Sequence, residues 1–423
     1  MATGIYVVGL GVSHEADLSP EALQVLQQVD LVVGSERQLA TLVSLLPVGK
    51  ATLLLPKLEA LQELIDESLA ANRSVMILAS GDPLFYGIGR WFSRHFSAEQ
   101  LTFYPAVSSL QVACHRLGIA LQDVEVLSLH GRPLLKLRTR LRQHQPLLIL
   151  TDAHSTPTAL AQECIACGFV DAKVTVCEAL GYPNEKIRGF TAQELVSESC
   201  QIEFDPLHVS LLEPGCNRGF LPEFPGIPDQ HFVTDKVGAG RGMLTKREVR
   251  LSILSQLQVA KGECVWDIGA GCGGVSVELA YWNPNSPIYA IEHHADRLGC
   301  LEQNRQRFGV VSNLSIVEGR APQALTGLPV PDKVFIGGSG GELPALLSHV
   351  WTLLPVGGVL LCSAVTEASK HHLYQFYETR LGSADSHYET LQVAVSHGNS
   401  LAGQVMYRPS LPVTLYVFKK ESR

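Results

Sequence analysis

The sequence predicts an α/β protein made of two domains, and three observations support this. Apolar runs typical of strands alternate with helical stretches along nearly the whole chain. A chain of 423 residues is too long for one ordinary core. The segment 207–232 has no helical period, and its second half is rich in Gly and Pro, which is typical of an interdomain linker. We therefore expect domains at 1–206 and 233–423, joined by that linker.

The first domain is expected to be α/β, with its sheet and helices distributed over two lobes. Its first strand is followed by a helix with Leu23, Leu26 and Val29 on one face. The later strands are short and buried in character, and helical runs separate them. The strand and helix signals follow one another at 4–11, 30–34, 58–71, 74–80, 101–118, 146–169 and 173–181.

The second domain shows a more regular alternation. A helix beginning near Thr245 precedes the first strand, and Thr245 with Glu248 has the spacing of a capping box. This pattern predicts a doubly wound, Rossmann-like and mainly parallel sheet. The expected strands lie at 264–271, 287–294, 313–319, 332–338 and 357–365.

Composition limits the partners and the compartment. The net charge of −8 and a pI near 6.0 argue against a nucleic-acid partner, and no apolar run approaches the length of a membrane span. Ten cysteines without framework spacing, and no secretory signal, indicate a cytoplasmic protein. Cys164 and Cys167 have no second ligand pair nearby, so we expect a helix there and no metal site.

The stretch "WDIGAGCGGVSVELA" at 266–280 places a glycine cluster between a strand and a helix. Gly269, Gly271 and Gly274 fit the dinucleotide motif, which would predict an NAD(P)-dependent oxidoreductase. Gly269, Gly271 and Gly273 also fit a motif for a cofactor without phosphate, which would predict methyl transfer. The glycines could also serve only to tighten a turn. Either cofactor would use unpaired N–H groups at the helix start.

Three further features favour methyl transfer. A helix precedes the glycine strand, "VEGRAP" follows the third strand, and "LLPVGGVLL" forms a turn that enters a late strand. The last two together resemble class I S-adenosylmethionine-dependent methyltransferases. The resemblance implies that Asp267 lies where that fold keeps its cofactor contacts and that Glu292 lies at the ribose. The implied second-domain cofactor site consists of Thr245, Gly269, Ala270, Gly271, Cys272, Gly273, Glu292, Gly319 and Ala321.

The first domain resembles a second family through "ASGDPLFYGIGR" and "YPAVSSLQ", supported by "LSLHGR", "LTDAHSTP" and "CEALGYPNEKI". These motifs are similar to those of the tetrapyrrole methylases, which hold S-adenosylmethionine between two α/β lobes. The resemblance implies cofactor contacts from Gly81, Asp82, Phe85, Ser108, Ser109, Thr151 and Ala179. The alternative is that Asp82 only forms a turn and Ser109 only caps a helix. Val12 and Ser13 depart from the Pro-Gly usual in this family.

The second domain also resembles the decarboxylating precorrin methyltransferases, through "MLTKREVR" and "VFIGGSGG". Together the two resemblances imply two S-adenosylmethionine sites per chain and a bifunctional enzyme of cobalamin biosynthesis. It would methylate precorrin-6Y, or a cobalt analogue, at C5 and C15, remove the ring C acetate carboxyl and give precorrin-8x. A homo-oligomer is expected by analogy. An oxidoreductase and a non-catalytic tetrapyrrole-binding scaffold remain as alternatives.

An anionic tetrapyrrole requires local basic groups and room for a flat molecule. In the basic stretch that begins at Arg132, positions 132, 136 and 140 would share one face of a helix. The loop "GGSGG" at 337–341 would let a bulky substrate approach the methyl group. We assign no general acid. The expected substrate contacts are His130, Arg132, Lys246, Gly337, Gly338 and Ser339.

Overall fold

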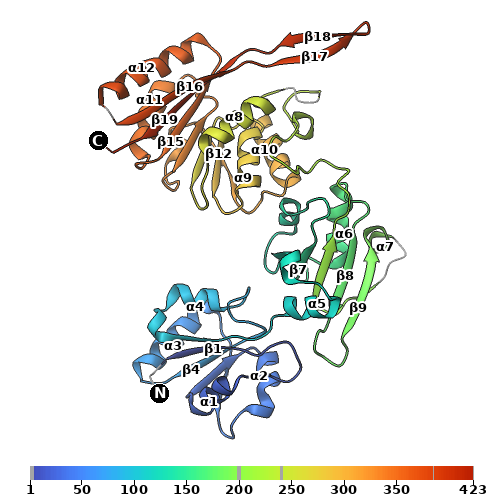
Figure 1. Ribbon diagram of the computed structural model, residues 1–423. Helices are drawn as coiled ribbons and strands as arrows, with labels where there is room; N and C mark the ends of the chain where they lie inside the picture. The colour runs from blue at the N-terminus through green and yellow to red at the C-terminus, as the bar shows by residue number, and fades with distance from the viewer. Residues whose placement is uncertain (1–3, 198–201, 239–241, 384, 423) are drawn as a thin grey trace. The chain divides into compact units, whose positions relative to one another are not determined.

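The computed structural model describes residues 4–197, 202–238, 242–383 and 385–422 (Figure 1). It divides into two compact units. Unit 1 contains Met1–Arg132 and Gln143–Cys216, and unit 2 contains Pro133–Arg142 and Asn217–Arg423. The two units are described separately.

The first sheet of unit 1 is parallel throughout, with strand order β3-β2-β4-β1-β5. Successive residues of β1 face opposite sides, because Val8 joins a core with α1 and α2 while Val7 joins a core with α3 and α4. Helices therefore cover both faces. The elements are β1 (Ile5–Gly9), α1 (Pro20–Gln28), β2 (Leu31–Gly34), α2 (Glu36–Leu42), β3 (Ala51–Leu54), α3 (Leu58–Ala70), β4 (Val75–Ala79), α4 (Gly89–His95) and β5 (Leu101–Tyr104).

The second sheet of unit 1 is mixed, with strand order β6-β7-β10-β8-β9. β6 and β7 are parallel, whereas β10 runs antiparallel to both β7 and β8. Two sheets in one unit confirm the predicted two-lobed α/β organisation. The elements are α5 (Ser109–Leu117), β6 (Glu125–Ser128), β7 (Leu147–Leu150), α6 (Pro157–Ala166), β8 (Lys173–Glu178), β9 (Lys186–Thr191), α7 (Ala192–Val196) and β10 (His208–Glu213).

The structure differs from the sequence prediction at the start of the expected linker 207–232. Its first residues form β10, the central strand of this sheet, and Leu212 is fully buried. The many Gly and Pro residues lie only after this strand. They led to the prediction of a linker over the whole segment, including the apolar residues that form β10. The division between the compact units falls after Cys216.

Unit 2 contains one seven-stranded sheet with order β13-β12-β11-β14-β15-β19-β16. The first five strands in that order are parallel, and β19 and β16 are antiparallel. The predicted doubly wound, mainly parallel sheet is confirmed. Its strands are β11 (Val265–Ile268), β12 (Ile288–Glu292), β13 (Leu314–Glu318), β14 (Lys333–Ile336), β15 (Val359–Ala364), β16 (Ser386–Val393) and β19 (Val413–Lys420).

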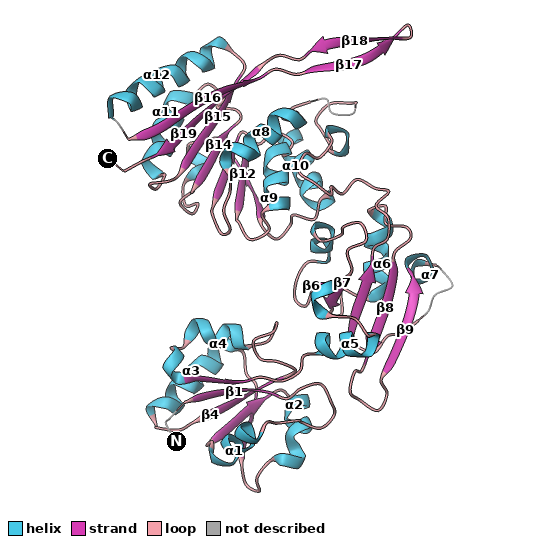
Figure 2. Ribbon diagram, in the orientation of Figure 1, coloured by secondary structure: helices cyan, strands magenta, loops and turns pink. Residues whose placement is uncertain are grey.

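Helices cover both faces of this sheet (Figure 2). On one face α11 and α12 pack against a core that includes Trp266 and Phe418. α8, α9 and α10 lie on the other, and the hairpin of β17 and β18 projects from the sheet. The elements are α8 (Arg247–Leu257), α9 (Gly274–Trp282), α10 (Ala295–Arg307), α11 (Leu343–Leu353), α12 (Glu367–Ser383), β17 (Ser396–Leu401) and β18 (Gln404–Pro409). Within the described ranges, no helix is long and apolar enough to span a bilayer.

The basic stretch predicted to place 132, 136 and 140 on one helical face does not form an α-helix. Residues 134–139 are a short 3-10 helix, and Leu137 and Leu141 are fully buried in unit 2. Arg138 Nη1 donates to Arg307 O at 3.1 Å, and Arg142 Nη1 donates to the Tyr281 hydroxyl at 2.7 Å. Burial of the leucines therefore sets this conformation, and its arginines serve packing inside unit 2.

Candidate functional site

A cavity of about 410 Å³ lies at the carboxyl ends of the parallel strands of unit 2, where ligands bind in doubly wound sheets. It collects residues from the loop before α8 and from the ends of five strands. Most of the residues predicted for unit 2 line it: Thr245, Lys246, Gly269, Ala270, Gly271, Glu292, Gly319, Ala321, Gly337, Gly338 and Ser339. Cys272 and Gly273, which were predicted with them, are buried and do not line the cavity.

Two glycines of the loop after β11 are required by close backbone approaches. Gly269 has φ +74°, and a Cβ there would stand 2.5 Å from the carbonyl oxygen of Gly338. Gly271 has φ +59°, and a Cβ there would stand 2.5 Å from Met243 O. Any side chain would therefore combine left-handed strain with a clash against rigid backbone. The loop brings the predicted cofactor glycines and the predicted substrate loop into direct contact.

The backbone N–H groups of residues 269–273, which precede α9, are all hydrogen-bonded within the protein. Gly269 and Ala270 both donate to Ile291 O, at 2.9 and 3.0 Å, and Cys272 donates to Met243 O at 3.0 Å. Gly271 donates to Glu292 Oε2 at 2.9 Å, and Gly273 donates to Ala270 O. Except for Ala270 O, which lies in the loop itself, the acceptors come from β12 and the loop before α8. The glycine loop thus shapes the cavity, while its amides hold neighbouring segments in place.

Glu292 is the buried carboxylate of the cavity wall and ends β12. Its Oε1 accepts the N–H groups of His293 and His294, at 2.8 and 2.9 Å. Its Oε2 accepts only the Gly271 N–H among the hydrogen bonds of the described residues. A carboxylate oxygen can accept two hydrogen bonds, so Oε2 keeps capacity for a hydroxyl in the cavity.

Asp267 lies on β11 just before the glycine loop and is completely buried. Its carboxylate faces α9 near Ser276, but neither oxygen makes a hydrogen bond of normal geometry. Burial raises the pKa of Asp267 to about 7, and the charge of Glu292 adds to the rise, while Ser276 only partly opposes it. Asp267 does not line the cavity, so it affects the site through the loop that follows it.

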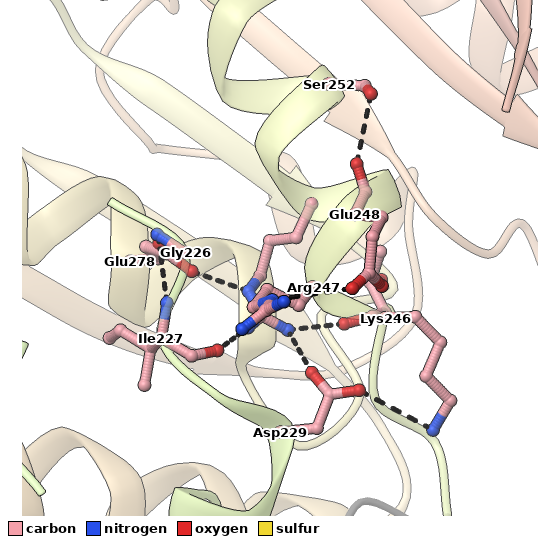
Figure 3. Close-up of polar contacts among 10 residues, drawn as sticks. Gly226, Ile227, Asp229, Lys246, Arg247, Glu248, Ser252 and Glu278 are labelled. Atoms are coloured by element: carbon pink, nitrogen blue, oxygen red, sulfur yellow. Dashed lines mark hydrogen bonds and ion pairs between the residues drawn. The ribbon is translucent and has the colours of Figure 1, made fainter. Parts of the chain in front are cut away.

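The loop that carries Thr245 and Lys246 is held by a buried ion pair (Figure 3). Arg250 of α8 and Glu278 of α9 have no exposed side-chain surface, and Nε lies 2.6 Å from Oε2. Arg250 Nη1 also donates to Thr245 O at 2.5 Å and to Asp229 Oδ1 at 3.0 Å. Glu278 Oε1 accepts the N–H of Ile227 at 3.1 Å. One arginine thus ties the segment before α8 to two helices and to the cavity wall.

The predicted capping box of Thr245 and Glu248 is wrong. The N-cap of α8 is Lys246, which makes no side-chain capping bond, so Thr245 lies one residue outside the helix. The Arg250 guanidinium holds the Thr245 carbonyl, and Glu248 instead pairs with Arg247 at 3.4 Å. This displacement by one residue leaves the Thr245 side chain at the cavity.

Sequence reasoning missed several cavity residues that carry charge or polarity: His293, Arg297, Arg320, Glu342 and Ser363. Arg320 stands inside the quoted "VEGRAP" motif, and Glu342 directly follows "GGSGG". Their place at the carboxyl ends of parallel strands was the signal that could have identified them. Arg297 lies on α10 and bonds Asp235, an arrangement that no local pattern indicates.

In unit 1 the predicted cofactor residues converge where strands β1, β4 and β5 end. Gly81 has φ +65°, and its N–H donates to Gly11 O at 3.0 Å. A Cβ on Gly81 would lie 3.3 Å from the Cα of Ser108, so the two residues are close neighbours. Asp82 Oδ1 accepts the N–H groups of Leu84 and Phe85 at 2.8 and 2.9 Å, so this oxygen closes the turn. The turn that the alternative interpretation assigned to Asp82 is therefore present.

Ser108, not Ser109, is the N-cap of α5. The Ser108 hydroxyl accepts the Gln111 N–H at 3.2 Å, and Gln111 returns a bond to the Ser108 N–H, so the alternative that placed the cap at Ser109 is wrong. Ser109 begins the helix and stays partly exposed. Phe85 packs against the core of the second lobe beside Leu180. These contacts bring the motifs "ASGDPLFYGIGR" and "YPAVSSLQ" together near the second lobe.

Thr151 and Ala179 lie on either side of the start of β10. Thr151 Oγ1 donates to His208 O at 3.0 Å, and Ala179, with φ +46°, donates its N–H to Leu207 O at 2.8 Å. His130 is exposed and its Nδ1 lies 3.4 Å from Thr151 O. Arg132 is exposed, and its Nη1 donates back to Ser128 O at 2.9 Å. His130 therefore adjoins a predicted cofactor residue, whereas Arg132 lies along β6.

Comparisons with known proteins cover both units. The model of the tetrapyrrole (corrin/porphyrin) methylases matches residues 4–196, and that of the precorrin methyltransferase domain matches residues 237–420. A Sinorhizobium protein named precorrin-6Y C(5,15)-methyltransferase (decarboxylating) is 34% identical over 416 residues, which are 98% of this chain and 96% of that protein. A Mycobacterium tuberculosis protein of the same name is 33% identical over 98% of this chain and all of its own length.

A crystal structure of precorrin-6Y C5,15-methyltransferase from Geobacter metallireducens is 35% identical over 46% of this chain and 98% of its own, with a TM-score of 0.42. The two relatives, in contrast, match along the whole chain. The resemblance seen in the sequence is confirmed, and the family is one of methyltransferases, not of dehydrogenases. The chain belongs to the family of the decarboxylating precorrin-6Y C(5,15)-methyltransferases.

Proposed function

We propose that this chain uses S-adenosylmethionine to methylate precorrin-6Y, or its cobalt analogue, at C5 and C15. The ring C acetate carboxyl is lost in the same domain that methylates C15, and the product is precorrin-8x. Full-length similarity to enzymes of that name supports the proposal. The observation that carries it is the cavity of unit 2, where Gly269 of the cofactor loop touches Gly338 of the substrate loop.

The cavity wall fits S-adenosylmethionine, which supplies an activated methyl group when it is bound. Gly269 and Gly271 line the cavity, and their lack of side chains lets the loop pack against Gly338 and Met243 and so gives the wall its shape. The free capacity of Glu292 Oε2 suits a ribose hydroxyl, because the carboxylate is already held by three backbone N–H groups. Gly319 and Ala321 form the wall expected to face adenine.

The substrate end of the cavity is proposed to be the loop after β14. Gly337, Gly338 and Ser339 expose backbone with little side-chain bulk, which suits a flat macrocycle. Lys246, from the segment before α8, brings a positive charge to the same cavity. The conjugated macrocycle can accept the electron pair released with carbon dioxide, so this chain needs chiefly to orient the methyl group and exclude water.

We assign methylation of C15 and decarboxylation to unit 2, with the predicted domain 233–423. Methylation of C5 and a second S-adenosylmethionine are assigned to unit 1, with the predicted domain 1–206. The approach of Gly81 to Ser108, and of Phe85 to the second lobe, supports a site at the lobe junction. Ala179 and Thr151 would complete it from the ends of β8 and β7.

Mass spectrometry of precorrin-6Y after incubation with the purified chain and S-adenosylmethionine tests the proposal. The expected product has gained two methyl groups and lost one carbon dioxide. Omission of S-adenosylmethionine is the control and should leave the substrate mass unchanged. A substrate that kept its mass in the complete reaction, or that changed only by two hydrogens, would contradict the proposed function.

A cytoplasmic homo-oligomer is part of the same proposal. Nine cysteines in the described part of the chain take part in no disulfide, which suits a reducing compartment. Every residue of β17 and β18 is exposed, including the apolar Leu401, Val405 and Tyr407. Such a hairpin suits pairing with another copy. Sedimentation should show an oligomer, and replacement of 396–409 by a short turn should give monomers; an unchanged sedimentation coefficient would contradict the role of the hairpin.

A further inference from the structure

The cavity of unit 2 contains more cationic groups than the sequence analysis had identified. Four side chains that can carry positive charge line it: Lys246, His293, Arg297 and Arg320. The proposed substrate is a macrocycle with many carboxylates, so each of these groups is a candidate partner. The following inference rests on that proposed function. The four candidates differ in whether a carboxylate of the protein lies beside them.

Three of the four already face a carboxylate of the protein. Lys246 Nζ lies 4.0 Å from Asp229 Oδ2, and Arg297 Nε lies 3.3 Å from Asp235 Oδ2. His293 Nδ1 lies 3.4 Å from Glu292 Oε1. A substrate carboxylate that approached any of them would also meet the negative charge of that partner. Their net attraction for another anion is therefore reduced.

Arg320 differs from these three. It follows Gly319 at the end of β13, and its side chain is exposed. Among the residues that the structure describes, no carboxylate lies within ion-pair distance of its guanidinium. Its Nη1 lies 3.8 Å from where a Cβ on Gly340 would stand. The guanidinium thus extends from the loop expected at adenine toward the loop expected at the substrate.

The position of Arg320 suits the binding of a carboxylate. A guanidinium presents parallel N–H donors that fit a carboxylate, and charge-assisted bonds of this type are the stronger ones. No acid of the described residues pairs with it, so a substrate carboxylate would not have to compete with a carboxylate already bound to the guanidinium. The neighbouring Gly340 and Gly341 leave room beside it.

We propose that Arg320 binds a carboxylate of the tetrapyrrole substrate that is retained in the product, and that it determines specificity for polycarboxylate macrocycles. A retained carboxylate is required by the energetics. A guanidinium on the departing carboxylate would stabilise the starting state more than the transition state, in which that charge moves into the macrocycle, and would slow decarboxylation. Arg320 therefore acts in substrate binding and positioning.

The test compares the full-length wild type with Arg320→Gln and Arg320→Lys. Loss of one charge-assisted contact should raise KM for precorrin-6Y about tenfold or more, with kcat changed little. Arg320→Lys should recover part of the loss. The dissociation constant of S-adenosylhomocysteine should stay within about twofold of wild type by calorimetry, because Arg320 is not assigned to the cofactor. Arg305→Gln, on α10 and paired with Glu302 outside the cavity, is the matched control.

Two outcomes would overturn the inference. The first is an equal KM for precorrin-6Y in Arg320→Gln and wild type. The second is a changed ratio of carbon dioxide released to methyl groups transferred in Arg320→Gln, which would place Arg320 at the departing carboxylate. Binding of uroporphyrin, a tetrapyrrole with only carboxylate side chains, gives a readout without turnover: the variant should weaken one site, and equal affinity overturns the inference. Wild-type enzyme that bound uroporphyrin but never methylated precorrin-6Y would contradict the proposed function alone.

Discussion

Single residues at the cavity of unit 2 act largely through the absence of side chains. Gly269 and Gly338 meet backbone to backbone, and that contact joins two loops that are 69 positions apart in the sequence. The spacing of the glycines predicted which residues would lie there. It could not predict that every amide of the loop is already bonded, because the acceptors Ile291 O and Met243 O come from distant segments. Hydrogen-bond partners depend on tertiary structure, whereas glycine positions can be read directly from the sequence.

Asp267 gives a prediction about pH and stability. Its pKa is about 7 in the folded protein and about 3.9 in an unfolded chain, so the folded state holds its proton more tightly. The free energy of unfolding should therefore fall as the pH rises from about 4 to 7. Asp267→Asn removes this loss and should stabilise unit 2 at pH 8 by up to about 4 kcal/mol, with little gain near pH 4.

Urea denaturation followed by tryptophan fluorescence measures this effect, because Trp266, Trp282 and Trp351 all belong to unit 2. Asp296→Asn is the control, since Asp296 is an exposed acid in the first turn of α10 and its loss should lower the stability by at most about 1 kcal/mol, with no gain at pH 8. A gain from Asp267→Asn that was equal at pH 4 and pH 8 would show that burial of this charge is not the cause.

Helices and strands were predictable where an apolar period was continuous. The five parallel strands of unit 2 are confirmed, because each is an apolar run followed by a helical or loop segment. β10 was missed because a Gly- and Pro-rich segment follows it, and the start of α8 was placed one residue early. The second error has a specific cause: Arg250 holds Thr245 from within α8, an interaction invisible to a local capping pattern.

The pairing of α8 with α9 gives a second prediction. Glu278→Gln would remove the closer of the two carboxylates that pair with the buried Arg250 and leave only Asp229, and breaking a buried ion pair costs up to about 3–5 kcal/mol. Unit 2 should therefore unfold at lower urea, and KM for S-adenosylmethionine should rise because Arg250, which holds the Thr245 carbonyl, is itself held less firmly. Replacement of both members, Arg250→Met with Glu278→Leu, should cost less than Glu278→Gln alone.

Fluorescence-detected denaturation and initial rates check this prediction. Glu302→Gln is the control, because Glu302 pairs with Arg305 on the surface of α10, where such pairs contribute about 0–1 kcal/mol. If Glu278→Gln and Glu302→Gln had similar effects on unfolding, the buried pair would not hold the loop as described.

Across the whole chain, two units of unrelated sheet topology are proposed to bind the same cofactor. Isothermal titration with S-adenosylhomocysteine should then find two sites per chain. Glu292→Ala should weaken only the site of unit 2, because it removes the carboxylate at the cavity wall. Asp82→Ala should weaken only the site of unit 1, because it releases the turn at Leu84 and Phe85.

The two variants control each other in this experiment. A single site in the wild type, or a loss of both sites in either variant, would contradict the assignment of one cofactor to each unit. The stoichiometry also separates the proposal from a dehydrogenase, for which only the glycine loop of unit 2 would bind a nucleotide.

The segment 133–142 has a consequence for dissecting this enzyme. The polypeptide enters unit 2 at Pro133, returns to unit 1 at Gln143 and departs again at Asn217. A protease that severed the backbone at 216–217 would leave the amino-terminal fragment still anchored, because Leu137 and Leu141 are embedded in the other half. Gene fragments divided at that position would encode a unit 1 that still carries the apolar segment 133–142 and a unit 2 that lacks it. We therefore expect the two fragments to be stable only when they are expressed together.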